Sequence, residues 1–439
     1  MTAFCAIDFG SPNPAIALPA GAGMRLVELE PGQPTLPTAV FCADLDTRRR
    51  ARDGASGLGC PELQLPVGER LAGPLEPSCA SILHAPRCHS IHRAQRSRSK
   101  YMADTVFVSG GSGYIAGFLI RQLLEQGWTV HTSLRSLARE PALRELLGGD
   151  ESRLKVFAAD LTRDAGWVEA MQGCSHVAHV ASPLPGNWVK KPDDLVVPAR
   201  DGVLRALRAA REAGVRRFVM TSSVAAIIYG RGRGVHHFTE ADWTPAEYPG
   251  ISPYTLSKTL AERAARDWVA REGTGLEFCS VNPSLVLGPV WGADYSSSVT
   301  LVKRLLMGSM PGCPDLGFGI VDVRDVADLH LRMLTAPGMA GERVIASGPF
   351  LKVIDIARML REHLGEQARR VPTRRLPDLL VRVAALFDPM VRTAVTELGA
   401  ERHTDARHAR ELLGWQARPV QQTVLDTARS LLEQGLVRP

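Results

Sequence analysis

The amino-acid sequence predicts an α/β protein with a doubly wound parallel sheet, a smaller C-terminal substrate-side domain and a disordered or irregular N-terminal leader. Three observations predict this fold class. From residue 102 onward, short apolar segments alternate with amphipathic segments. A glycine-rich turn follows the first apolar segment, and a tyrosine and a lysine stand four residues apart further along the chain. Strands and helices that alternate in this way form parallel sheets covered by helices on both faces.

The composition changes sharply near residue 102. Five of the eight cysteines and eleven of the thirty prolines precede this position. The stretch 51–77 is dense in Gly, Pro and Leu and has no sustained period of 2 or 3.6 residues. Such a segment buries too little apolar surface to build a packed core, so we expect disorder over most of residues 1–101.

The first 45 residues of this leader resemble the opening strands of the ATPase domain of heat-shock-type chaperones. The resemblance lies in residues 5–10, 11–18 and 35–41. Pro12 and Pro14 each remove a backbone N–H from the turn where that family binds phosphate. We therefore interpret residues 1–101 as a fusion remnant or an incorrectly assigned start, and Met102 as the beginning of the functional protein.

Six segments after Met102 have the composition of strands buried in a parallel sheet. They are residues 105–109, 129–134, 154–158, 176–180, 217–221 and 277–281. Helical segments fit between them; the first, 114–126, repeats its apolar residues at helical spacing. Right-handed connections are expected throughout. Helices after residue 353, including 379–386 and 424–432, would complete the smaller domain.

A glycine-rich turn, residues 109–116, directly follows the first predicted strand. Its small residues Gly110, Gly113 and Ala116 let the backbone turn tightly and approach a pyrophosphate. Tyr114 and Ile115 open the next helix, whose N-terminus attracts the phosphate charge. A plain turn is the alternative, but the position between a strand and a helix predicts a dinucleotide site of Rossmann type.

The end of the second predicted strand indicates which dinucleotide binds. NAD sites usually carry an acidic residue there, whereas this chain has Arg135, with Arg139 soon after. A guanidinium matches the 2′-phosphate of NADP, so we expect NADP(H) rather than NAD(H), unless Arg135 is only a surface residue. Asp160 and Leu161, after the third strand, would lie near the adenine; the alternative for Asp160 is a helix cap.

Tyr254 and Lys258 are spaced to share one face of a helix. A nearby ammonium favours the ionised phenol and lowers a tyrosine pKa from about 10 towards the range where proton transfer is efficient. Alone, the pair is more typical of a solvated helix surface. With Ser222 and Ser223 upstream, and with the dinucleotide turn, the set contains the groups needed to reduce a carbonyl.

Together these residues resemble the extended short-chain dehydrogenase/reductase family, in its branch of dihydroflavonol reductases, cinnamoyl-CoA reductases and bacterial aldehyde or ketone reductases. The resemblance covers residues 104–439. Its pieces stand in order along the chain: 109–116, Arg135, 179–183, 218–223, Tyr254 with Lys258, 282–289 and 322–327. The third small residue of the turn is Ala116 rather than glycine, a change that this family accommodates.

The resemblance implies a role for each catalytic residue. Tyr254 would protonate the substrate oxygen, Ser223 would hydrogen-bond the same oxygen, and Lys258 would hold the nicotinamide ribose and lower the pKa of the tyrosine. Val180 and Ala181, after the fourth strand, and Pro283 would contact the cofactor, while Ser222 would be structural. The NADP-binding core would lie mainly in 104–283 and the substrate-side part mainly in 284–439.

Several classes of function are disfavoured by composition. The net charge of +6 comes from scattered arginines, and the cluster from Arg87 to Lys100 is interpreted as a solvated linker, so nucleic acid is not an expected partner. No apolar run is long enough to span a membrane and no signal peptide is evident, which favours the cytoplasm. The eight cysteines have no metal-binding spacing, so neither a metal site nor a disulfide framework is expected.

Two alternatives to an NADPH-dependent aldehyde or ketone reductase remain. A nucleotide-sugar epimerase or dehydratase shares the fold, but sugar dehydratases carry Thr-Asp-Glu where this chain has Thr221-Ser222-Ser223. A non-catalytic NADP-binding sensor would often lack the tyrosine or lysine. The small-molecule carbonyl substrate is not identified. Residues 284–350 are expected to supply much of its pocket wall, with Trp291, Tyr295, Met307 and Met310 as candidate lining, although core packing is the more common fate of each. The oligomeric state is not readable from the sequence, although a homodimer is common in the family that the chain resembles.

Overall fold

The computed structural model describes residues 6–8, 15–20, 23–28, 104–148, 151–183, 191–292, 295–386 and 395–438. The chain divides into two units, 1–96 and 97–439. In the first unit, β1 (Ala6–Asp8), β2 (Ala15–Ala20) and β3 (Gly23–Glu28) form an antiparallel sheet in that order. The rest of the predicted leader, including the segment 35–41, lies outside the described residues.

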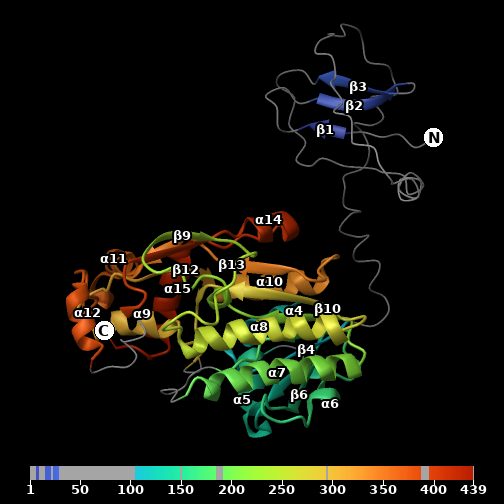
Figure 1. Ribbon diagram of the computed structural model, residues 1–439, viewed down its shortest axis with the longest axis horizontal. Coiled ribbons are helices and arrows are strands. Elements are labelled where there is room, and N and C mark those ends of the chain that lie inside the picture. The colour runs from blue at the N-terminus through green and yellow to red at the C-terminus, as the bar shows by residue number, and fades with distance from the viewer. Residues whose placement is uncertain are drawn as a thin grey trace. The chain divides into compact units, whose positions relative to one another are not determined.

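A seven-stranded parallel sheet forms the centre of the second unit (Figure 1). Its order is β13-β10-β8-β7-β4-β5-β6, and all neighbours are parallel. The strands are β4 (Thr105–Val108), β5 (Thr129–Leu134), β6 (Leu154–Ala158), β7 (His176–His179), β8 (Arg217–Thr221), β10 (Glu277–Pro283) and β13 (Arg343–Ala346). The strand order reverses between β4 and β7, which is where such folds bind their ligands.

The predicted doubly wound α/β fold is therefore confirmed, and each of the six predicted strands is present. The seventh, β13, was not predicted. It is a short strand that begins with the charged Arg343, and it comes from the part of the chain assigned mainly to the substrate side. Its parallel pairing with β10 completes the sheet.

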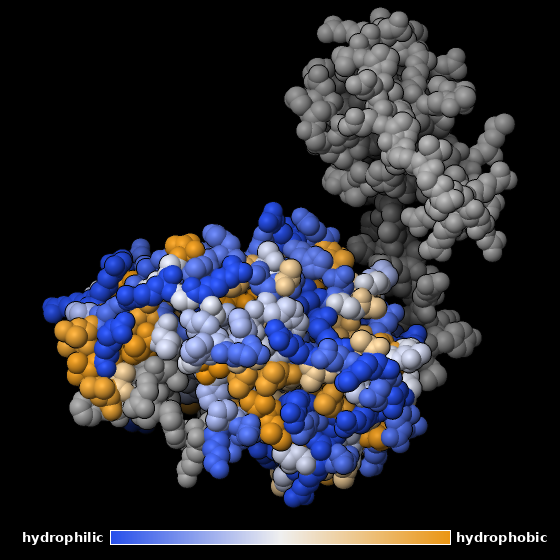
Figure 2. All heavy atoms as spheres, in the orientation of Figure 1, coloured by the Kyte–Doolittle hydropathy of each residue, from blue (hydrophilic) through white to orange (hydrophobic). Residues whose placement is uncertain are grey.

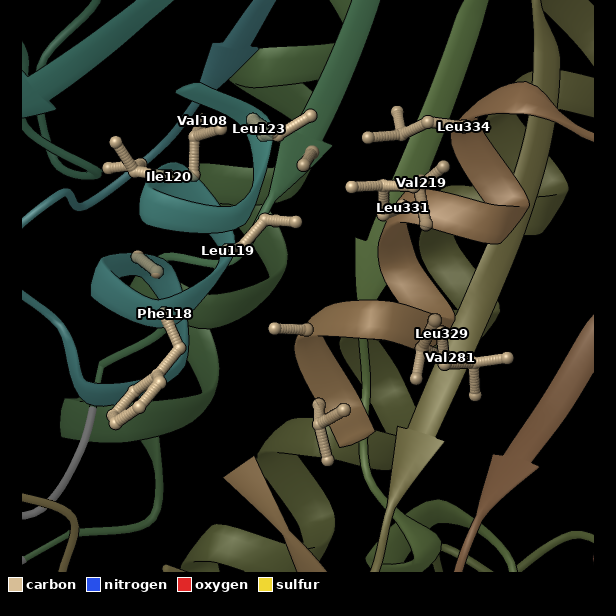
Figure 3. Packing of buried hydrophobic residues seen from close by; sticks show 14 of the residues in the cluster. Val108, Phe118, Leu119, Ile120, Leu123, Val219, Val281, Leu329, Leu331 and Leu334 are labelled. Carbon is tan, nitrogen blue, oxygen red and sulfur yellow. The ribbon is translucent and has the colours of Figure 1, made fainter. Parts of the chain in front are cut away.

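Successive side chains of the central strands belong to different hydrophobic clusters. In β4, Val106 and Val108 join one cluster and Phe107 the other, because side chains of a strand alternate between its two faces. The first cluster packs beneath α4 (Tyr114–Glu125) and α10 (Val323–Thr335). Figure 3 shows its side chains between these helices and the sheet, among them Leu119, Leu123, Val219, Val281, Leu331 and Leu334.

The opposite face of the sheet is covered by three helices. They are α6 (Trp167–Met171), α7 (Asp193–Glu212) and α8 (Pro253–Glu272), whose buried residues form the second cluster. Figure 1 shows α7 and α8 side by side along the sheet. The short helix α5 (Glu140–Leu147) lies near α4 and has Leu143 and Leu147 in the first cluster.

Two small sheets and a further hydrophobic cluster lie outside the central sheet. β11 (Leu285–Leu287), β12 (Gly317–Asp322) and β14 (Phe350–Lys352) form one sheet, and β9 (Gly234–Phe238) pairs with β15 (Ala400–Thr404) in the other. The helices are α9 (Val299–Leu306), α11 (Val353–Leu364), α12 (Asp378–Ala384), α14 (Arg407–Leu413) and α15 (Val420–Glu433). Buried residues of α9, α11 and α15 form a third cluster. The two helices predicted after residue 353 correspond to α12 and α15.

The surface is mixed in polarity (Figure 2). One apolar group at the end that carries α12 contains the exposed side chains Leu379, Leu380, Val383 and Leu386. Within the described residues, no helix combines the length and the apolar character needed to cross a membrane.

Candidate active site

Helix α8 brings Tyr254 and Lys258 to one face. The helix begins with Pro253 after Ser252, whose Oγ accepts a hydrogen bond from the backbone N–H of Thr255 at 3.1 Å. This cap and the proline fix where the helix starts, so Tyr254 lies in the first turn. Nζ of Lys258 lies 6.0 Å from the centroid of the Tyr254 ring.

Ser223 follows the end of β8 and meets Tyr254. It caps the short 3₁₀ turn η3 (Val224–Ala226), with its Oγ accepting from the N–H of Ala225 at 3.1 Å. The Ser223 side chain also forms a hydrogen bond with the Tyr254 phenol. Both side chains line a pocket of about 270 Å³. The hydroxyl of Ser222 instead donates to Oε2 of Glu262 at 2.6 Å, inside the protein.

The surroundings change the proton affinities of both α8 residues. Burial raises the pKa of Tyr254, and the hydrogen bond with Ser223 opposes this effect. Burial lowers the pKa of Lys258 to about 8, with the charge of Glu262 acting in the opposite direction. The direction for Tyr254 is the reverse of the one expected from the Tyr-Lys spacing, because burial has the larger effect. Tyr254 is therefore protonated at neutral pH, as a proton donor must be.

The glycine turn has the conformation that its residues predict. Gly110 has a φ of +72°, a region that L side chains rarely adopt, and a Cβ there would lie 3.0 Å from Cβ of Ala181. The N–H of Gly113 donates to the carbonyl of Gly110 at 2.8 Å, and the N–H of Gly110 donates to Oγ of Ser133 at 2.9 Å. The turn is therefore held tightly against the ends of β5 and β7.

The N-terminus of α4 fits an anionic group. Gly113 is its cap residue, no side chain caps the helix, and the first turn contains no acidic residue. The N–H groups of Tyr114, Ile115 and Ala116 are thus at the positive end of the helix dipole with a glycine in front of them. The Tyr114 hydroxyl donates to the carbonyl of Pro289 at 3.2 Å, so its side chain is tied to the substrate-side part and only its backbone faces the turn.

The loop after β7 is tied to the glycine turn. Oγ of Ser109 accepts from the N–H of Ala181 at 2.9 Å and lies 3.2 Å from Nδ1 of His179. This contact places Val180 and Ala181 beside Gly110, at the point where the strand order reverses. Burial lowers the pKa of His179 to about 3, and the charge of Lys258 acts in the same direction, so this histidine is neutral.

Arg135 and Asp160 lie at the ends of the neighbouring strands β5 and β6. Arg135 is exposed, and its charge contributes to lowering the pKa of Asp160. The larger causes of that lowering are two hydrogen bonds to Oδ1 of Asp160, from Oγ1 of Thr162 at 2.7 Å and from its N–H at 2.8 Å. Asp160 therefore closes a local turn, and Leu161 packs against Gly202 of α7.

Pro283 is the last residue of β10 and is buried between two polar neighbours. Before it, Nδ2 of Asn282 donates to the carbonyl of Ser223 at 3.1 Å. After it, Ser284 lines the Tyr254 pocket, and its hydroxyl has no hydrogen-bond partner among the described residues. Pro283 thus adjoins both Ser223 and the pocket.

The four apolar residues expected to line the substrate pocket lie elsewhere. Trp291 stacks on Phe118, with 3.9 Å between ring centroids, and lines a separate pocket beside the glycine turn. The Tyr295 hydroxyl accepts from Nζ of Lys303 at 3.0 Å, Met307 is exposed, and Met310 packs on the third cluster. Of the two alternatives, packing fits Trp291, Tyr295 and Met310, whereas Met307 faces solvent.

The Tyr254 pocket is lined instead by two charged residues that the sequence did not predict. Nη2 of Arg402, on β15, lies 2.6 Å from Oε2 of Glu397, and the Arg402 guanidinium lies 5.0 Å from the centroid of the Tyr229 ring. Tyr229 also lines the pocket. No motif signals these residues, because they reach the pocket through the pairing of β15 with the distant β9.

No metal centre is found in the part of the chain that the structure describes, where no three His, Cys, Asp or Glu residues gather suitably. The described cysteines Cys174, Cys279 and Cys313 are buried and unpaired. Burial raises the pKa of Cys174 and of Cys279 to about 12, so neither is a reactive thiolate.

Comparison with known proteins agrees with this geometry. The model of the NAD dependent epimerase/dehydratase family matches residues 106–346. A cinnamoyl-CoA reductase of Medicago truncatula is 34% identical over 278 residues, which are 60% of this chain and 82% of the relative. A dihydroflavonol 4-reductase of Zea mays is 31% identical over 272 residues, 60% of this chain and 75% of the relative.

A solved structure shares the fold. The yeast methylglyoxal/isovaleraldehyde reductase, complexed with NADPH, matches with a TM-score of 0.63 and 26% identity. The match covers 76% of this chain and 100% of that one.

Proposed function

Because the chain belongs to the NAD dependent epimerase/dehydratase family, we propose that it is an oxidoreductase that reduces an aldehyde or ketone with NADPH. The observation that carries the proposal is the hydrogen bond between Ser223 and Tyr254 in a pocket, with Lys258 one helical turn away. The names of its relatives, cinnamoyl-CoA reductase and dihydroflavonol 4-reductase, support reduction as the reaction class.

The residues divide the work on the carbonyl between them. When bound, NADPH supplies the hydride that the carbonyl carbon receives. Tyr254 donates its phenolic proton to the carbonyl oxygen, and its raised pKa keeps that proton available. The Ser223 hydroxyl hydrogen-bonds the same oxygen and stabilises its developing negative charge. Lys258 would hold the nicotinamide ribose, and its Nζ lies 6.0 Å from the centroid of the Tyr254 ring.

The residues around the turn would hold the dinucleotide. The diphosphate would bind the backbone of Gly110, Gly113, Tyr114, Ile115 and Ala116, where the uncapped helix favours negative charge.

Six further residues would hold the ends of the cofactor. Arg135 is exposed and free to meet the 2′-phosphate, and Asp160 with Leu161 would border the adenine. Val180, Ala181 and Pro283 would line the path to the nicotinamide, since the first two lie beside Gly110 and the third beside Ser223.

A screen of carbonyl compounds tests the proposal. The protein is incubated with aldehydes, ketones and flavanonols in the presence of NADPH and, separately, of NADH. Oxidation of the nucleotide is followed as the loss of absorbance of its reduced form. We expect at least one carbonyl to be reduced, with NADPH preferred. Conversion of a UDP-sugar without net consumption of the nucleotide would instead identify an epimerase and overturn the proposal.

A further inference from the structure

Four charged or ionisable residues form a row along one face of α8. Tyr254, Lys258, Glu262 and Arg266 follow one another at intervals of four residues. Side chains at this spacing are neighbours on the helix surface. The row therefore begins at the phenol in the pocket and continues, through an ammonium and a carboxylate, to a guanidinium.

Glu262 is fully buried and bonded to five side chains. They are Ser222 Oγ at 2.6 Å, Asn282 Nδ2 at 2.9 Å, Ser280 Oγ at 3.0 Å, Arg343 Nε at 2.8 Å and Arg266 Nε at 3.3 Å. Burial by itself would raise the pKa of Glu262, but Arg343 and Arg266 bring it below its usual value. Glu262 is therefore ionised inside the protein, where a charge persists only with partners of this kind.

Two of these partners fix the backbone at the catalytic serine. Ser222 precedes Ser223, and its own N–H donates to the carbonyl of Val281 at 2.8 Å. Asn282 Nδ2 donates both to Glu262 Oε2 and to the carbonyl of Ser223 at 3.1 Å. The Glu262 carboxylate thus holds Ser222, which precedes Ser223. It also holds the Asn282 side chain, which donates to the Ser223 carbonyl.

The same carboxylate acts on Lys258. The groups that face Lys258 are Tyr254 and Glu262 on its own helix and the neutral His179 on β7. Of these, Glu262 carries the only negative charge, and it is the influence that favours the protonated lysine against burial. Arg343 and Arg266 are hydrogen-bonded to Glu262 and keep it ionised.

We propose that Glu262 is a positioning residue of this reductase, which holds Ser223 in place through Ser222 and Asn282 and keeps Lys258 charged. The inference rests on the proposed function. It extends the site from the residues that touch the substrate to the buried network behind them.

Replacing Glu262 with glutamine should change the pH dependence of carbonyl reduction. Without the carboxylate, less opposes the lowering of the Lys258 pKa by burial, so this lysine loses its proton at a lower pH. We expect kcat/KM for carbonyl reduction to begin its alkaline decline at a lower pH in Glu262→Gln than in the wild-type protein. The measure is the protonated fraction of Lys258: a fall of one unit from a pKa of about 8 lowers that fraction at pH 8 roughly fivefold, so the variant should lose about fivefold there and less at pH 6.5.

Asp325→Asn is the matched control. Asp325 is also buried and bonded to an arginine, with Nε of Arg418 at 3.0 Å and Nη2 at 2.7 Å, but it is not among the groups that face Lys258. Its loss should reduce stability without moving the alkaline decline. Glu262→Asp keeps the charge, so its alkaline decline in kcat/KM should begin at the same pH as in the wild-type protein.

The outcomes separate the inference from the proposed function. If wild-type protein oxidises NADPH with a carbonyl and Glu262→Gln declines at the same pH as wild type, the inference is overturned and the function stands. If wild-type protein reduces no carbonyl, the function itself fails. Should Glu262→Gln not fold, Ser222→Ala decides: a reduced kcat with an unchanged pH profile supports the positioning role, and a wild-type kcat contradicts it.

Discussion

Replacing Gly110 with alanine should weaken cofactor binding more than it weakens the fold. At its φ of +72° an L residue is strained by about 1–2 kcal/mol. The added Cβ would also lie 3.0 Å from Cβ and 3.3 Å from Cα of Ala181. A backbone atom cannot move aside as a flexible side chain can, so the loop after β7 must shift away from the turn.

Gly214→Ala separates the two effects. Gly214 has a φ of +74°, and among the described residues no atom lies within 4 Å of a Cβ added there. Both variants should lose stability through backbone strain, measured as the free energy of unfolding in urea, and Gly110→Ala should lose more because its Cβ also meets Ala181. Only Gly110→Ala should also bind NADPH about tenfold more weakly or worse, which is 1.4 kcal/mol or more.

Fluorescence titration with NADPH measures the second effect. The reasoning requires that Gly214→Ala binds NADPH as the wild-type protein does. Wild-type affinity in Gly110→Ala would refute the assignment of this turn to the dinucleotide.

Three further outcomes are expected. Arg135→Ala should weaken NADPH binding by roughly tenfold to a hundredfold, the worth of a charge-assisted hydrogen bond, and leave NADH binding unchanged; equal losses for both nucleotides would argue against a 2′-phosphate contact. Because the pKa of Lys258 is about 8, kcat/KM of the wild-type protein should be level below that pH and fall about tenfold per pH unit above it, and a profile level to pH 10 would contradict this. A protein comprising residues 102–439 should match the full chain in carbonyl reduction, and its inactivity would show that the leader is needed.

The sheet could be predicted from local patterns because its central strands are buried on both faces. A continuous apolar run between helical segments, as in β4 or β8, has few other interpretations in an alternating chain. β13 could not be predicted, because a four-residue strand that begins with arginine is not a continuous apolar run. Its place in the sheet depends on pairing with β10, which no local pattern encodes.

The candidate site was predictable where its residues belong to motifs. The glycine turn, Ser223 and the Tyr254–Lys258 pair carry their spacing in the sequence. The pocket wall was not predictable, since Arg402 and Glu397 reach it through the pairing of β9 with β15. The pKa of Tyr254 was misjudged for a related reason: spacing reveals the neighbouring lysine but not the burial that outweighs it.

The central claim is that Tyr254 protonates the carbonyl oxygen, and Tyr254→Phe tests it most directly. The change removes one hydroxyl from a ring that otherwise keeps its packing. Steady-state turnover with the best carbonyl from the screen and titration with NADPH are measured on the same preparation. The account predicts a fall in kcat of about 10²- to 10⁴-fold with NADPH affinity within about twofold of wild type. Turnover at the wild-type rate would contradict it.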